Sequence, residues 1–150
     1  MSSDADIRHL LAILDQAYDK RSWHGTNLRG SIRGLSARQA SRRPRPGRHN
    51  IWEIVVHAAY WKYVAWRRLT GQPRGSFPLE GSNWFKRPES ESERAWRADI
   101  ALLGHMHRSL RAAVAKRRHL RPRDRFLISG AAAHDVYHAG QIQLLKKLQP

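Results

Sequence analysis

The chain has 150 residues, a length that fits one domain with its own hydrophobic core. It contains no cysteine, which excludes disulfide frameworks, thiolate zinc sites, iron–sulfur clusters and cysteine nucleophiles. Its formal net charge of +16 attracts polyanions whatever the fold. We therefore expect one domain over residues 1–150, in which any metal is bound by His or carboxylate side chains.

The first half of the chain predicts two main helices. The first spans roughly residues 4–21, with Ser3 as its N-cap and a buried stripe made of Ile7, Leu10, Leu11, Leu14, Ala17 and Tyr18. A short helix around residues 28–35 and a connection rich in Pro and Arg follow. The second main helix spans residues 50–71, with Asn50 and Glu53 as a capping pair. Its buried stripe is Ile54, His57, Trp61, Val64 and Leu69, widened by Val55, Ala58 and Ala65.

The second half predicts two longer helices after a long connection. Residues 71–89 are rich in Gly, Pro and large aromatics, which favours a packed lid over one end of the fold. A capping box at residues 90–93 opens a helix to about residue 119, with a buried stripe of Trp96, Ile100, Leu103, His107, Leu110 and Val114. The last helix runs from near residue 124 to residue 148 along Leu127, Ala131, His134, His138, Gln141, Ile142, Leu145 and Leu148.

Four amphipathic helices with two long connections predict an all-α fold. No stretch alternates polar and apolar residues for long enough to predict a strand. The long connections favour a four-helix bundle with crossovers over a simple up-down bundle.

Three histidines carry the chemistry of this sequence. His134 and His138 are four residues apart, so they share one face of their helix. Both fall on the predicted buried stripe, and so does His57 on another helix. A buried imidazole is costly unless its nitrogens find partners, and one cation in the core would serve all three. Three protein ligands leave coordination positions open, as in catalytic sites where a bound water becomes a nucleophile.

We consider two other interpretations of these histidines: one without a metal, which stays open, and a peptidase, which is disfavoured. They can be core histidines that bond to backbone carbonyls without any metal. A zincin-like peptidase is disfavoured, because His134 is followed by Asp rather than Glu. His107 also lies on a predicted core stripe and is a candidate fourth ligand, but a single His on an apolar face is more often structural.

The segments NIWEIVVHAAYWKYVAWRRLTG, HDVYHAGQIQLLKKL and DKRSWHGTNLRGSIRGL together resemble the DinB-like superfamily, also called the YfiT-like or DNA-damage-inducible group. The resemblance covers essentially the whole chain. It implies a metal-binding four-helix bundle whose ligands are His57, His134 and His138. It also implies zinc or nickel as the divalent ion, a homodimer, and a small-molecule substrate. Members of the superfamily include transferases and isomerases that use low-molecular-weight thiols.

The predicted function is therefore that of a metal-dependent enzyme, either a thiol-dependent transferase or isomerase or a metal-assisted hydrolase. Glu53 and Gln141 each lie one turn from a metal-ligand candidate, where they can hold a ligand's second nitrogen, although capping is the stronger interpretation for Glu53. His24, Tyr60 and Tyr137 are further candidates for the pocket. The amino terminus shows no signal-peptide pattern and no segment is long enough to span a bilayer, so we expect a cytoplasmic protein.

A rival function starts from the charge. Two Arg-rich loops, residues 42–48 and 117–125, could bind nucleic acid while the metal only stabilises the bundle. No helix-turn-helix, zinc-finger or RNA-binding signature supports it. A third hypothesis is a non-catalytic or stress-related bundle whose metal is purely structural.

Overall fold

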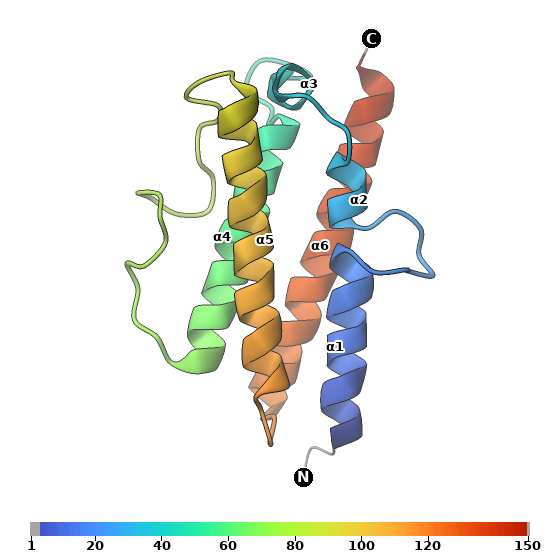
Figure 1. The fold of residues 1–150 in the computed structure, drawn as a ribbon, viewed down its shortest axis with the longest axis vertical. Coiled ribbons are helices and arrows are strands. Elements are labelled where there is room, and N and C mark those ends of the chain that lie inside the picture. The colour runs from blue at the N-terminus through green and yellow to red at the C-terminus, as the bar shows by residue number, and fades with distance from the viewer. Residues whose placement is uncertain (1–3, 150) are drawn as a thin grey trace.

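The computed structural model of the protein describes residues 4–149. Within that range the chain forms helices and no strand, so the predicted all-α class is confirmed (Figure 1). The helices are α1 (Asp4–Tyr18), α2 (Leu28–Ile32), α3 (Ala37–Ser41), α4 (Ile51–Thr70), α5 (Glu93–Ala115) and α6 (Pro122–Leu148). None of these helices combines the length and the apolar character needed to cross a membrane.

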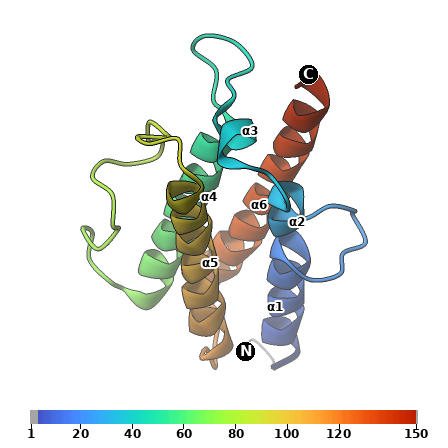
Figure 2. The same ribbon diagram turned by 45° about the horizontal axis from the view of Figure 1, so that its top comes forward.

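The four long helices form a bundle with a crossover. Helices α4 and α5 lie side by side and run in the same direction, whereas α1 and α6 run the opposite way (Figure 1, Figure 2). Two parallel neighbours need a connection that returns along the bundle, and residues 71–92 provide it. This connection was expected to cover one end of the fold, but it follows the side of α4 instead, where Tyr60 and Tyr63 contact its Phe77.

Several helix boundaries differ from the predicted ones. Helix α1 ends at Tyr18, and its predicted cap Ser3 lies outside the described residues. The N-cap of α5 is Ser92 rather than the predicted box at residue 90. Helix α6 begins at Pro122, where a missing backbone donor is tolerated because the first turn has no acceptor for it.

Helix α3 lies within a segment for which we predicted an irregular connection. Ser36 accepts a hydrogen bond from the backbone N–H of Gln39, and the Gln39 side chain accepts from the backbone N–H of Ser36. The sequence pattern S-x-x-Q at Ser36 and Gln39 is typical of this reciprocal capping box and could have predicted the helix. The same device begins α4, where Asn50 and Glu53 form the predicted box.

The buried face of α6 is rotated relative to the predicted stripe. Its buried residues are Asp124, Ile128, Ala132, Asp135, His138, Ala139 and Ile142. Leu127 and Ala131 are only half-buried, and Leu148 is 67% exposed. The cause is that α6 packs against α1, α2 and α4 together, so its contacts follow three neighbours rather than one apolar stripe.

An unpredicted ion pair lies in the centre of the bundle. Lys62 on α4 is 2% exposed and donates to Asp135 on α6, which is fully buried. The same ammonium donates to His107 Nδ1 at 3.2 Å and lies 4.9 Å from the centre of the Tyr18 ring. Tyr18 stacks on His107 with ring centroids 3.8 Å apart. The group therefore joins α1, α4, α5 and α6 through one positive charge.

We predict that Asp135→Ala lowers the free energy of unfolding by about 3–5 kcal/mol, because it leaves the Lys62 ammonium buried without its counter-charge. Urea denaturation with chelator present measures this effect apart from any metal. The double variant Lys62→Met/Asp135→Leu should recover most of the loss. Glu91→Ala, at an exposed position, is the control. A loss below about 1 kcal/mol for Asp135→Ala would contradict the prediction.

Candidate metal centre

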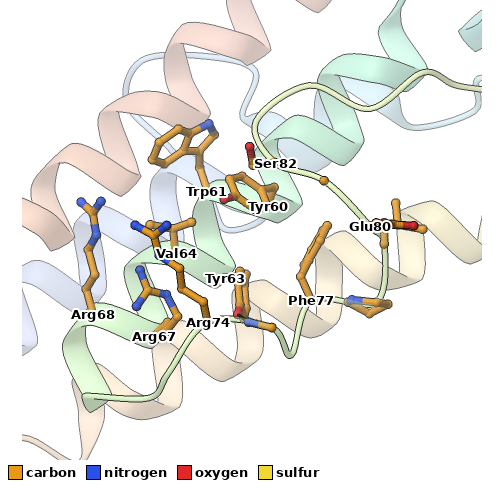
Figure 3. A pocket seen from close by; sticks show the side chains of 14 residues that line it. Tyr60, Trp61, Tyr63, Val64, Arg67, Arg68, Arg74, Phe77, Glu80 and Ser82 are labelled. Carbon is orange, nitrogen blue, oxygen red and sulfur yellow. Dashed lines mark hydrogen bonds between the residues drawn. The ribbon is translucent and has the colours of Figure 1, made fainter.

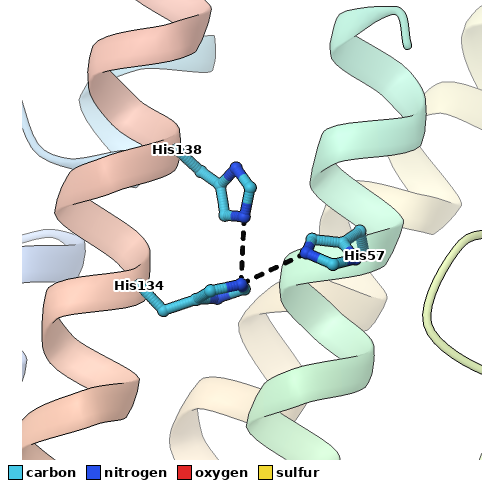
Figure 4. Close-up of side chains that lie close together, drawn as sticks. All are labelled: His57, His134 and His138. Atoms are coloured by element: carbon cyan, nitrogen blue, oxygen red, sulfur yellow. Dashed lines mark hydrogen bonds between the residues drawn. The ribbon is translucent and has the colours of Figure 1, made fainter.

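Three histidines from two helices converge on one point (Figure 4). His57 lies in α4, and His134 and His138 lie one turn apart in α6. His134 Nε2 is 3.2 Å from His57 Nε2 and 3.0 Å from His138 Nε2. One nitrogen of each ring lies within 4.8 Å of the other two, a spacing that fits one shared metal ion.

Two of the rings are held by hydrogen bonds on their far sides. His57 Nδ1 donates to the backbone carbonyl of Asn83 at 2.9 Å, and His138 Nδ1 donates to Gln141 Oε1 at 2.7 Å. A neutral imidazole carries one proton, so the Nε2 atoms of both rings present lone pairs toward His134. This arrangement, with Nδ1 bonded and Nε2 free, is the one that orients histidines toward metals.

Burial keeps the cluster neutral. It lowers the pKa of His57 to about 4 and that of His134 to about 3, and it also lowers the pKa of His138. Neutral imidazole is the form that binds metals. With two lone pairs facing it, His134 has at most one Nε2 proton to share between them. The donor set therefore fits a divalent cation, which can accept all three lone pairs at once.

The connection between α4 and α5 holds the His57 ring from outside. The Trp84 ring stacks on His57 with centroids 3.8 Å apart and on His49 with centroids 3.6 Å apart. Asn83 adopts a left-handed conformation with φ of 66°, and its side-chain oxygen accepts from Trp61 Nε1 at 2.9 Å. No role for Asn83 or Trp84 at this site was predicted from the sequence. Asn is a residue that tolerates this conformation, but nothing local indicates which ring its carbonyl reaches.

A cleft of about 540 Å³ opens beside the histidines. This volume is in the range of small-molecule sites. Apolar side chains form much of its wall, and the rim offers a guanidinium and an imidazole; the lining residues apart from the three histidines are Pro44, Arg48, His49, Ile54, Trp84, Tyr137, Gln141, Leu144 and Leu145. A small substrate can therefore reach the histidine cluster.

Of the candidate supporting residues Glu53, Gln141 and His24, one contacts the histidine cluster and two do not. Gln141 bonds His138 directly. Glu53 caps α4 and accepts from Arg43 and His49. Burial would raise the pKa of Glu53, but those two partners hold it below its usual value. His24 is exposed and donates to the backbone carbonyl of Gln16, so it lies apart from the site.

The pocket candidates Tyr60 and Tyr137 line different cavities. Tyr60 packs on Phe77 and Phe85 of the connection, with ring centroids 5.3 and 5.5 Å away. Tyr137 is exposed at the cleft, with its ring 5.1 Å from that of His138. Of the two, Tyr137 can contact a substrate at the histidines.

His107 does not join the three histidines. It accepts from Lys62, and burial together with that positive charge lowers its pKa to about 2. A second group of potential ligands, Asp15, Asp19 and His107, also falls within 4.8 Å. Both carboxylate oxygens of Asp15 already accept from Arg111, at 2.7 and 2.9 Å. In this second group Asp15 and His107 are therefore already engaged by cations, unlike the three histidines of the first group.

Several arginines of the two Arg-rich loops are used inside the chain. Arg43 pairs with Glu53, Arg121 with Asp124, and Arg125 with Asp6. Arg117 donates to the backbone carbonyl of Leu69 at 2.8 Å. The basic loops therefore have a structural use of their own, and nucleic-acid binding stays an untested prediction.

A comparison with protein-family models matched residues 20–142 to a model described as the DinB superfamily. The match covers most of the chain and includes all three histidines of the cluster. Searches of the curated proteins and of the solved structures found no significant match.

We predict that the metal-free protein loses stability as the pH falls from 7.5 to 5. The folded pKa values of His57 and His134 lie below the usual 6.5, so the unfolded chain takes up protons first. Their contribution is complete above about pH 6.5 and decreases toward pH 4, by about 1–2 kcal/mol per histidine at pH 5. Urea denaturation with chelator measures it.

The His134→Phe variant is the control for this pH dependence. It removes one titrating group from the folded cluster and should show a shallower loss between pH 7.5 and 5. Equal free energies of unfolding at the two pH values in the unsubstituted protein would show that the histidines are not held neutral.

Proposed function

Because the chain belongs to the DinB superfamily, we propose that His57, His134 and His138 hold one divalent metal ion in a metal-dependent enzyme that acts on small molecules. The observation that carries this proposal is that the Nε2 atoms of the three rings face one another. In His57 and His138 the Nδ1 atom is hydrogen-bonded, to Asn83 and to Gln141 respectively. A group of structural histidines would gain nothing from directing lone pairs at each other.

Zinc or nickel is the ion that we propose. Neutral imidazoles suit both metals, and the chain has no thiolate to favour a softer one. Three protein ligands leave room for a substrate or water, which is the pattern of catalytic zinc sites.

When bound, the ion would polarise a carbonyl or acidify a water or thiol in the cleft. The chain supplies the remaining functions. The hydrogen bonds to Asn83 and Gln141 hold the ligand rings, and Trp84 covers one face of His57. Leu144 and Tyr137 provide an apolar wall beside the cluster, while Arg48 at the rim offers a guanidinium to an anionic part of the substrate.

Thiol-dependent transfer or isomerisation is the reaction class that we favour, with metal-assisted hydrolysis as the other. Since the chain contains no cysteine, the thiol must belong to a low-molecular-weight cosubstrate. We also propose a homodimer, which light scattering on the purified protein can test.

We predict about one equivalent of zinc or nickel in protein purified without chelators, measured by elemental mass spectrometry. His57→Ala and His134→Ala should lose the metal while circular dichroism keeps its helical signal. His24→Ala, which alters an exposed histidine outside the cluster, should retain it. Metal bound by His134→Ala, or no metal in the unsubstituted protein after reconstitution, would refute the site. Turnover that survives in His134→Ala would refute the catalytic role alone.

Gln141→Leu should weaken metal binding by about 10–100-fold, because His138 loses the acceptor that orients its ring. Competition with a chromophoric chelator measures the dissociation constant. Gln143→Leu is the matched control, since Gln143 lies on the same helix and contacts Thr26 and Lys146 instead. Equal affinities in the two variants would remove Gln141 from the site.

A further inference from the structure

A second cavity, of about 700 Å³, lies along the second half of α4 (Figure 3), whereas the histidine cleft contacts the first half at Ile54 and His57. The second half of α4 forms one wall, and residues 74–82 of the connection form the other. None of the three histidines lines it. Its volume is within the range of small-molecule sites.

Aromatic rings form much of the cavity wall. Phe77 packs against Tyr60 and Tyr63 with ring centroids 5.3 Å away in each case. Tyr60 in turn contacts Trp61, with centroids 5.6 Å apart. These contacts fix the rings against each other, so they offer a preformed surface on which a flat aromatic group can pack.

The connection that closes the cavity is tied to α4. Tyr63 Oη accepts from the backbone N–H groups of Gly75 and Ser76, both at 3.2 Å. Gly75 has φ of 107°, a conformation that disfavours any side chain. Arg74, the preceding residue, lines the cavity together with Arg67 and Arg68 of α4.

Three arginines gather at one end of the cavity, whereas Glu80 lies at the other end beside Phe77 (Figure 3). Arg67, Arg68 and Arg74 form no salt bridge within residues 4–149. Arg67 donates to the backbone carbonyl of Gln72, at 3.4 Å. Guanidinium groups bind phosphate oxygens in bidentate pairs, and a cluster of three matches a dianion.

We propose that this cavity is a binding site for a small aromatic phosphate, whose ring packs on Phe77, Tyr60 and Trp61 and whose phosphate binds the three arginines. The site is separate from the histidine cleft and does not depend on the proposed metal. A ridge of α4 formed by Trp61, Val64 and Arg68 divides it from a smaller cavity of about 170 Å³ that reaches His134.

The test is a binding titration of the full chain with 1-naphthyl phosphate in the presence of chelator. Calorimetry should give one saturable site with a dissociation constant below about 1 mM. Inorganic phosphate lacks the ring and 1-naphthol lacks the anion, so each should bind about tenfold more weakly or worse. Equal binding of either compound, or no saturable binding of the naphthyl phosphate, overturns the proposal.

The variant Arg68→Gln/Arg74→Gln should weaken naphthyl phosphate binding about tenfold or more. Arg118→Gln/Arg123→Gln removes the same charge from exposed positions outside the cavity and should keep the affinity within about twofold. An equal loss of affinity in the two double variants would show that the effect comes from net charge and not from the cavity. His134→Ala should bind normally, and a loss there would place the ligand at the histidines instead. Either result overturns the proposal.

Discussion

The buried ion pair between Lys62 and Asp135 sets how α4 and α6 meet, and the rest of the structure follows from that contact. Asp135 directly follows His134, and Lys62 lies five residues after His57. Because a buried charge without its partner is strongly disfavoured, the pair allows only a register in which both groups meet. In that register the three histidines face one another at the edge of the core.

The crossover shapes both candidate sites. Parallel α4 and α5 require a connection as long as the bundle, and that connection lies along α4. Near its end, Asn83 and Trp84 hold the His57 ring. Nearer its start, Phe77 and Arg74 close the aromatic cavity. A simple up-down bundle with short loops would have neither group of contacts, so the topology itself provides the sites.

The arginines behind the net charge of +16 include two groups with different surroundings. One set of arginines is held by acidic partners within the fold: Arg87 makes a bidentate pair with Asp99, which also accepts from Trp52 at 2.6 Å. These arginines stabilise the bundle. The cluster at the aromatic cavity lacks such carboxylate partners within the described chain, and it leaves its positive charge available to a ligand.

The sequence by itself determined what depends on local spacing. The helical class followed from apolar periodicity, the start of α4 from Asn50 and Glu53, and the pairing of His134 with His138 from their four-residue separation. The buried face of α6, the partner of Lys62 and the carbonyl that orients His57 were decided only by the tertiary structure. The physical reason is that burial and long-range hydrogen bonds depend on which helices become neighbours. A backbone carbonyl, moreover, is the same group in every residue, so no pattern of side chains could single out the one at Asn83.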